Sequence, residues 1–271
     1  MRAAASAALP VLKFLSVLML VSAPVAAWGG LAPRAVVGAI SPHHSVTAAL
    51  IDRLYERIAE LTPNPARVVI IGPDHFDRAQ AGVAMGAPNW LSGHGRLLLP
   101  GDEAGAAALA WAMPRRDDAV RRDHCISEHI RRVRRFLGRA PVLALLVKPG
   151  AGDMALLRAG RALEDLLKED GGVVILSMDL SHYKPRAASD AEDERSLAAL
   201  TGFRFNELKG LDIDCRRGAR LFLALMQVFE CTEASVLGRS NSDDFTRRPS
   251  EYTTGHAAVL YLPPGATPHG P

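Results

Sequence analysis

Cysteine is scarce in this chain of 271 residues, and the three cysteines, Cys125, Cys215 and Cys231, form no CxxC pair. Three cysteines allow at most one disulfide, so a disulfide framework is excluded and at least one thiol stays free to act as a ligand. The sequence also lacks the GxGxxG and Walker patterns that would predict a phosphate-binding loop. These absences direct attention to isolated side chains rather than to a nucleotide motif.

Excess charge is also missing, because the net charge is only +3. A nucleic-acid-binding protein needs a concentrated basic face, so we expect no nucleic-acid partner. The exception is residues 115–139, which contain nine arginines and four acidic residues. Mixed charge of this kind is typical of a solvated helix face, and an anionic substrate or a membrane surface is the alternative partner.

The chain has no apolar run long enough to be an ordinary membrane span. The run Phe14–Ala27 has 14 residues, whereas a spanning helix needs roughly 20. Basic residues precede the run and small residues end it, which is typical of a secretory signal peptide cleaved before Trp28. We therefore predict that residues 1–27 are a signal peptide and that the protein is periplasmic or extracellular. A membrane anchor, if this segment is not cleaved, and a cytoplasmic protein are the alternatives.

Beyond this leader, short apolar runs alternate with segments of helical period. The predicted strands are 35–41, 67–71, 141–147, 172–178, 234–240 and 255–263, and the predicted helices are 47–61, 102–113, 127–137, 153–168, 187–208 and 217–229. Residues 76–101 are rich in glycine and proline and are interpreted as irregular loops. The alternation predicts an α/β fold, a single domain over residues 34–263 with a central largely parallel or mixed sheet flanked by helices. Residues 264–271 are expected to be a flexible tail.

Polar side chains follow three of the predicted strands. His43 follows the first strand, His75 follows the second, and Asp179 and His182 follow the strand "VVILSM". The carboxyl ends of parallel strands meet at the edge where ligands bind, and the loop that carries Cys215 is long enough to reach it. Imidazole and thiolate suit zinc, copper or iron, so the sequence predicts a metal site. A metal-free acid–base site built on His182 and Asp179 is the alternative.

The remaining histidines have weaker claims to a role. His94 lies in the glycine-rich stretch and is expected at the surface. His256 lies on a predicted closing strand, where lining the core or the pocket is expected rather than metal binding. His44 is next to His43 and competes with it for the same role.

An ordered set of motifs resembles one known family. The segments "ISPHH", "IIGPDHF", "DHCISEHI", "LSMDLSHY", "DCRRG" and "RSNSDDF…EYTTGHAAVLYL" are together similar to the Memo family, component B of the bacterial AmmeMemoRadiSam group. The likeness spans roughly Val36 to Leu262 and implies the fold of class III extradiol dioxygenases. It also implies copper or iron bound by two histidines and a cysteine, which correspond here to His43, His75 and Cys215. The same resemblance makes His182 a pocket residue.

The sequence departs from the family pattern in several places. His44 replaces the alanine that usually follows the first histidine, and Arg216 replaces the glycine that usually follows the cysteine. Glu128 lies one position later than the family's acidic residue after His124. The resemblance implies a metal-binding protein, redox-active or dioxygenase-like, and a thiolate ligand favours copper. The alternative is a non-catalytic binding protein whose pocket recognises a small molecule or a peptide.

Overall fold

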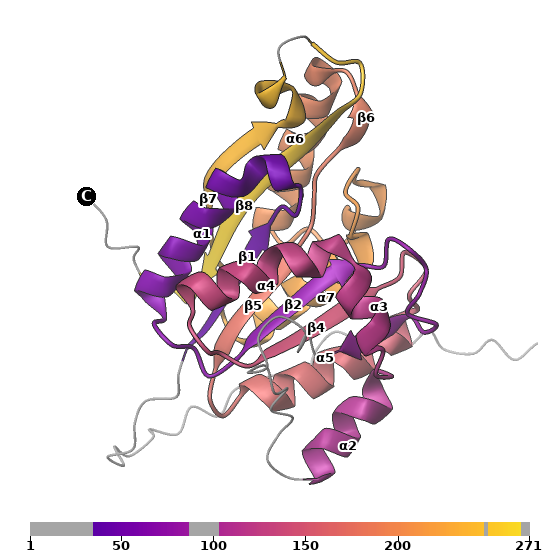
Figure 1. The fold of residues 1–271 in the computed structure, drawn as a ribbon, viewed down its shortest axis with the longest axis vertical. Coiled ribbons are helices and arrows are strands. Elements are labelled where there is room, and N and C mark those ends of the chain that lie inside the picture. The colour runs from indigo at the N-terminus through magenta and orange to yellow at the C-terminus, as the bar shows by residue number, and fades with distance from the viewer. Residues whose placement is uncertain (1–34, 87–102, 247–248, 267–271) are drawn as a thin grey trace, which may run out of the picture. The chain divides into compact units, whose positions relative to one another are not determined.

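Four parallel strands form the centre of the sheet, in the order β4 (Val142–Val147), β2 (Val68–Pro73), β5 (Gly172–Ser177) and β1 (Val36–Ser41). Every residue of these strands is buried. Strands covered on both faces need apolar side chains on both, which is why they read as continuous apolar runs. The structure is a computed structural model that describes residues 35–86, 103–246 and 249–266, and it is shown in Figure 1.

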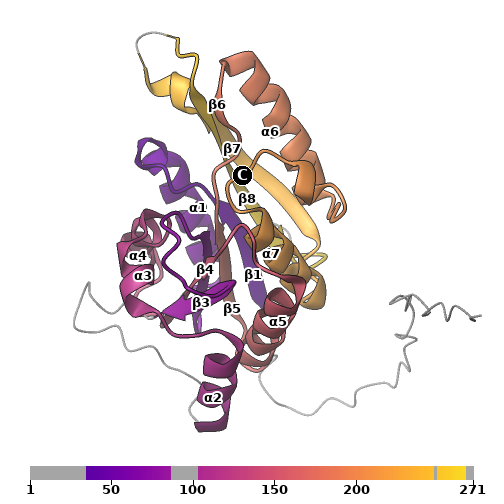
Figure 2. The same cartoon turned by 90° about the vertical axis from the view of Figure 1, so that its right-hand side faces the viewer.

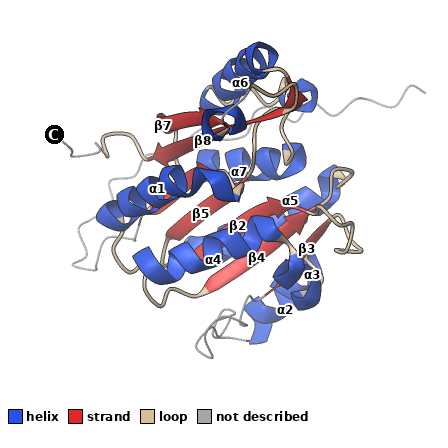
Figure 3. Ribbon diagram, turned by 45° about the horizontal axis from the view of Figure 1, so that its top comes forward, coloured by secondary structure: helices blue, strands red, loops and turns tan. Residues whose placement is uncertain are grey.

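Antiparallel strands extend this centre on both sides. β3 (Val83–Gly86) pairs with β4, and β8 (Thr253–Leu262) pairs with β1. β8 in turn pairs with β7 (Glu233–Asn241) and β6 (His182–Lys184). The described residues therefore form a mixed sheet of eight strands, with the parallel strands pointing the same way in Figure 3.

Helices cover both faces of the sheet (Figure 2). One face carries α1 (Ala48–Leu61), α3 (Asp117–Arg122) and α4 (His124–Phe136). The other carries α2 (Glu103–Ala112), α5 (Asp153–Leu167), α6 (Arg186–Thr201) and α7 (Arg216–Val228). Successive strand residues face opposite sides, so Ile70 packs beneath the first group and Ile71 beneath the second. Each such side chain contributes about 1.5–3 kcal/mol when fully buried.

The structure confirms the predicted single α/β domain with a sheet flanked by helices. The short strands β3 and β6 and the short α-helix α3 were not predicted. The interpretation of residues 76–101 as loops is wrong for Val83–Gly86, because these four buried residues pair with β4. Residues 87–102, which include His94, lie outside the described residues. So do the predicted signal peptide and most of the predicted tail, which stay predictions.

Helix α4 begins at His124, three residues earlier than its apolar period predicts. The cause is Asp123, whose side chain accepts a hydrogen bond from the Cys125 amide at 3.2 Å and caps the first turn. This early start carries His124 to the edge of the sheet.

The arginine-rich stretch forms α3, α4 and the segments around them. Arg132 donates to Asp52 and to Glu128, and Arg135 donates to Asp52. These ion pairs support the interpretation as a helix face, and a partner for the stretch stays a prediction. Among the residues that the structure describes, no helix is both long and apolar enough to cross a membrane.

Candidate metal centre

Three histidines meet at the carboxyl edge of the parallel strands. His43 follows β1, His75 follows β2, and His124 is the first residue of α4. Each offers one ring nitrogen, and these nitrogens all lie within 4.8 Å of one another. The ring centroids of His75 and His124 are 4.3 Å apart, and each is 5.1 Å from that of His43. The strand-end pattern thus brings His43 and His75 together, and it adds a third histidine.

Two carboxylates complete this group of side chains. Asp214, two residues before α7, places Oδ2 3.2 Å from His43 Nε2 and 3.9 Å from His75 Nε2. Asp179, which follows β5, places Oδ2 3.4 Å from His43 Nε2. The Asp179 amide also donates to Asp214 Oδ1 at 3.2 Å, which connects the two loops. His43, Asp179 and Asp214 form a second group whose ligand atoms lie within 4.8 Å of one another.

Hydrogen bonds set the orientation of the His43 ring. The Ser177 hydroxyl donates to the carbonyl of Cys125 at 2.7 Å, so its oxygen is free to accept. His43 Nδ1 lies 3.1 Å from that oxygen and is therefore the donor. With the proton on Nδ1, the Nε2 lone pair of a neutral ring points at Asp179 and Asp214.

Asp123 orients His75 in the same way. Its carboxylate accepts from His75 Nδ1 at 2.8 Å and from the His75 amide at 3.1 Å. Burial by itself raises the pKa of Asp123, but the hydrogen bond and charge of His75 and the hydrogen bonds from Cys125 together outweigh it and lower the pKa below its usual value. A histidine whose Nδ1–H is held by a carboxylate presents Nε2 as a metal ligand. Gly72 allows this arrangement, because a Cβ there would lie 2.5 Å from the Cys125 sulfur of α4.

The centre requires a cation between its ligands. A neutral His43 would aim a lone pair at two carboxylates, and Asp214 Oδ2 is buried without a well-formed hydrogen bond. Burial by itself lowers the pKa of His43, but Asp179 and Asp214 outweigh it and raise the pKa to about 9. A proton or a metal ion on Nε2 removes the repulsion. Two donor atoms that each lie about 2.0–2.1 Å from one ion, with a donor–ion–donor angle of about 90–109°, are about 2.9–3.4 Å apart. The distances from His43 Nε2 to the oxygens of Asp179 and Asp214, 3.4 and 3.2 Å, fall in this range.

The centre opens to solvent on one side. The side chain of His43 is 2 % exposed, that of His75 is 24 % exposed and that of His124 is 53 % exposed. Phe76 is half exposed, and its ring centroid lies 6.3 Å from those of both His75 and His124. A ligand would therefore approach past Phe76 and His124.

A second histidine pair lies beside the same carboxylate. His44 Nδ1 is 3.1 Å from Nε2 of His256 on β8, and these two residues and Asp179 form another group with ligand atoms within 4.8 Å of one another. His256 is completely buried. Burial lowers the pKa of His256 to about 4, although Asp179 opposes the shift. The expectation that His256 lines the core or the pocket agrees with this position, and its place in a group of ligand atoms was not predicted.

The two residues predicted to act as an acid–base pair lie close to this centre. Asp179 is buried within it, and although burial raises its pKa, His43 lowers the pKa below its usual value. His182 begins β6 and is partly buried, and its amide lies 3.3 Å from an oxygen of Asp212. The charge of His182 acts on Asp179. Their predicted catalytic roles stay predictions.

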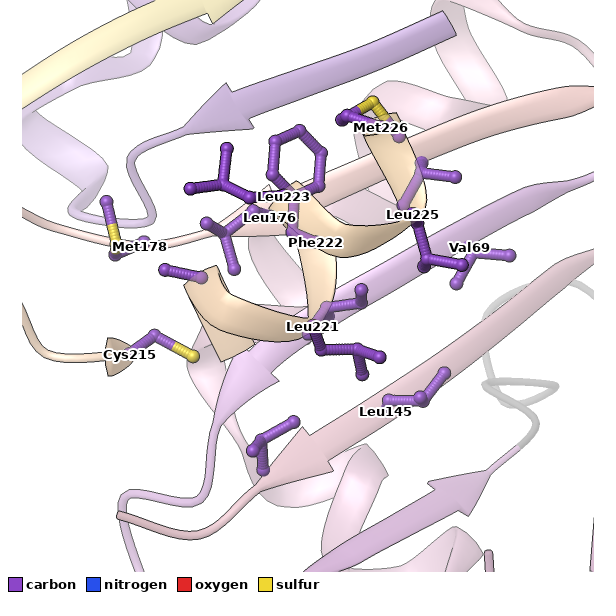
Figure 4. Close-up of a cluster of buried hydrophobic side chains, with 14 of the residues drawn as sticks. Val69, Leu145, Leu176, Met178, Cys215, Leu221, Phe222, Leu223, Leu225 and Met226 are labelled. Atoms are coloured by element: carbon purple, nitrogen blue, oxygen red, sulfur yellow. The ribbon is translucent and has the colours of Figure 1, made fainter. Parts of the chain in front are cut away.

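Cys215 lies in the hydrophobic core rather than among these groups of ligand atoms. Figure 4 shows it in the cluster of buried side chains beneath α7. Gly218 makes room for the thiol, because a Cβ there would lie 2.3 Å from the sulfur. Burial, and then the charge of Asp214, raise the pKa of Cys215 well above its usual value. Within the described part of the chain, no group of three candidate ligands includes it, and its predicted role as a metal ligand stays a prediction.

Sequence reasoning did not single out Asp214, Asp123 or Ser177. Asp214 had a signal, since it directly precedes the predicted ligand Cys215 in "DIDCRRG". Asp123 also had one, because an aspartate before an amphipathic run is an N-cap candidate. Ser177, the last residue of β5, had one in the motif "LSMDLSHY", of which it is the second residue.

Together the fold and these groups define a class, an α/β protein with histidine and aspartate clusters able to hold a metal ion. Residues 31–257 match the model of the family described as "Memo-like protein", and the chain belongs to that family.

Individual relatives agree with this assignment. A MEMO1 family protein of Aquifex aeolicus (strain VF5) is 23% identical over 205 residues, which cover 73% of this chain and 76% of the relative. One of Nitrosopumilus maritimus (strain SCM1) is 23% identical over 161 residues, 59% of this chain and 58% of the relative. The crystal structure of an uncharacterized protein from Escherichia coli K12 aligns with a TM-score of 0.53 and 13% identity, covering 83% of this chain and 99% of that one. This likeness shows that the two chains share a fold.

Proposed function

We propose that this protein binds a metal ion at His43, His75 and Asp214 and is a dioxygenase-like oxidoreductase acting on a small molecule. The observation that carries the proposal is the buried Asp214 Oδ2, which lies 3.2 Å from His43 Nε2 without a well-formed hydrogen bond. Two histidines and one carboxylate are the ligands typical of non-haem iron(II) oxygenases. The proposal therefore favours iron over copper, since the soft Cys215 thiol lies in the core.

The iron ion would supply open coordination positions and the capacity to activate O₂. The protein itself holds and orients the ligands. Ser177 fixes the ring of His43, and Asp123 fixes that of His75. His124 stands at the exposed side with Phe76, where both would contact a substrate that enters the centre.

Asp179 has a different task in this arrangement. It accepts the amide proton of His43 at 3.1 Å through Oδ1 and faces the ring of His43 with Oδ2. It therefore keeps the loop after β1 in place beside the loop after β5. Its negative charge would draw a proton that the substrate releases toward partly exposed His182, which would pass that proton to solvent.

Metal content tests the proposal. The chain is purified without an affinity metal, stripped with a chelator, loaded anaerobically with iron(II), and analysed by mass spectrometry. We expect an iron equivalent that His43→Ala, His75→Ala and Asp214→Ala each remove. Asp212→Ala is the matched control, because it removes a carboxylate from the same loop that instead pairs with Lys184; it should keep the iron.

Cys215→Ala decides between the two candidate third ligands. Retained iron would support Asp214, whereas iron lost in Cys215→Ala and kept in Asp214→Ala would overturn the ligand set proposed here. A folded chain that takes up neither iron(II) nor copper(I) would overturn the metalloprotein proposal altogether. Oxygen uptake with a catechol as probe, compared between the loaded wild type and His182→Ala, then tests the oxidoreductase activity.

A further inference from the structure

A second set of donors lies beside the first centre. His44 directly follows His43 in the chain, and His256 reaches the same place from β8, where it is completely buried. Their facing ring nitrogens are 3.1 Å apart. An oxygen of Asp179, itself 4 % exposed, lies within 4.8 Å of both. The set thus contains two imidazoles and a carboxylate, all ordinary ligands of first-row divalent metals.

The spacing of the two rings suits one shared ion. Donors about 2.0–2.1 Å from a common ion lie about 2.9–3.4 Å apart at angles of about 90–109°, and the observed 3.1 Å falls inside this range. A hydrogen bond between the rings has a similar length, but it does not account for a carboxylate within reach of both. Ser240 Oγ lies 3.5 Å from His256 Nδ1 and can accept a hydrogen bond from a proton held there, in which case Nε2 is free to bind.

Asp179 belongs to both sets of donors. It faces His43 Nε2 at 3.4 Å in the first centre and completes the group of His44 and His256 in the second. An ionised carboxylate has two oxygens and about four lone-pair sites, so one side chain can serve two ions. Sites with two metal ions about 3.5–4 Å apart are common in enzymes that act on oxygen-rich substrates.

We propose that Asp179 bridges two metal ions, one bound by His43, His75 and Asp214 and a second bound by His44 and His256. The first ion rests on the metal centre of the proposed function, whereas the second rests on His44, His256 and Asp179 alone. His182, which begins β6, pairs with Thr254, two residues before His256 on β8, so His182 would lie on the side of the second ion. A substrate oxygen bound between the two ions would be held from both sides.

Zinc is the probe for the test, because it is redox-silent and binds histidine and carboxylate ligands. The metal-free full-length chain is titrated with zinc(II) against a chromophoric chelator, and each variant is checked for folding by circular dichroism. We expect two equivalents in the wild type and one in His44→Ala, where a partly exposed side chain is shortened. We expect one equivalent of zinc in His75→Ala, and none in the double variant that combines His44→Ala with His75→Ala. Asp212→Ala, which removes a carboxylate outside both sets that pairs with Lys184, should keep two.

The variants separate this inference from the proposed function. A single equivalent that survives His44→Ala and disappears in His75→Ala would overturn the second ion and leave the first centre standing. A single equivalent that disappears in His44→Ala and survives in His75→Ala would keep the second ion and overturn the first. If Asp179→Asn folds and retains two equivalents of unchanged affinity, the bridging role is wrong. No uptake by the folded wild type would overturn both ions.

Discussion

Two buried polar groups of this protein are built on opposite rules. The first is a seryl network formed by Ser181, Ser189, Asn241 and Thr253, all completely or almost completely buried. Asn241 Nδ2 donates to Ser189 Oγ at 2.9 Å and to Thr253 Oγ1 at 3.2 Å. Thr253 donates onward to a carbonyl at 2.8 Å, and the hydroxyls of Ser181 and Ser189 share a hydrogen bond of 2.7 Å. In this network each donor finds an acceptor.

The metal centre is the second group, and without a proton or a metal ion on His43 Nε2 its inner atoms would be acceptors facing acceptors. His43 Nε2 meets oxygens of Asp179 and Asp214, while the proton of the ring is held at Nδ1 by Ser177. A protein gains nothing in stability from burying such a set without a cation, because unpaired buried charge is costly. The comparison teaches that buried polar groups with matched donors stabilise a fold, whereas groups lacking a cation mark a binding site.

Breaking the seryl network should have the largest effect on stability. Asn241→Ala removes the donor to Ser189 and Thr253 and the acceptor for the Asp243 amide. Leaving such groups unsatisfied costs about 1–3 kcal/mol each, so we expect a loss of about 3 kcal/mol in the free energy of unfolding. Urea denaturation of the metal-free protein measures it. A loss below about 1 kcal/mol would show that water replaces the missing amide.

Metal should stabilise the protein by a similar amount. A ligand at 100 times its Kd that binds only the folded state adds about 2.7 kcal/mol. We expect this gain from the first ion in the wild type and in Asn241→Ala, and a smaller gain in Asp214→Ala, where that ion loses a buried ligand and only the ion proposed at His44 and His256 would bind. Thermal unfolding with and without iron(II) is the measurement. An equal gain in Asp214→Ala would contradict the ligand role of Asp214.

Weakening the support of His75 should have a smaller effect. Asp123→Asn keeps the size of the side chain but loses the charge that holds His75 Nδ1 at 2.8 Å. Loss of such a partner typically weakens metal affinity 10–100-fold, which is about 1.4–2.7 kcal/mol. Competition with a chelator of known affinity measures the change. Asp118→Asn, an exposed carboxylate of α3, is the matched control.

The smallest expected effect concerns Cys215. Cys215→Ala removes a buried sulfur from the core beneath α7 and should cost about 1 kcal/mol of stability, as a small core truncation does. It should leave metal affinity within twofold of the wild type. Chemical denaturation and the same chelator competition provide the two values. A tenfold or larger loss of affinity would return the thiol to the set of ligands.

The sequence predicted the fold well because its main signals are periodic. The continuous apolar runs of β2 and β5 and the helical period of α1 each have one stable interpretation. β3 and β6 were missed because a strand of three or four residues carries too little pattern, and its pairing with β4 or β8 supplies the missing stability.

The sequence by itself determined that His43, His75 and Asp179 meet, because each follows a parallel strand and those ends lie at one edge of the sheet. It named Cys215 as the third ligand and did not single out Asp214, since neighbouring residues in a loop point in different directions. Only the tertiary structure shows that Cys215 is buried against the core while Asp214 faces His43. The same holds for His44 and His256, whose contact joins residues 212 positions apart. Local pattern fixes which residues reach an edge, and packing across the sheet fixes which of their atoms face one another.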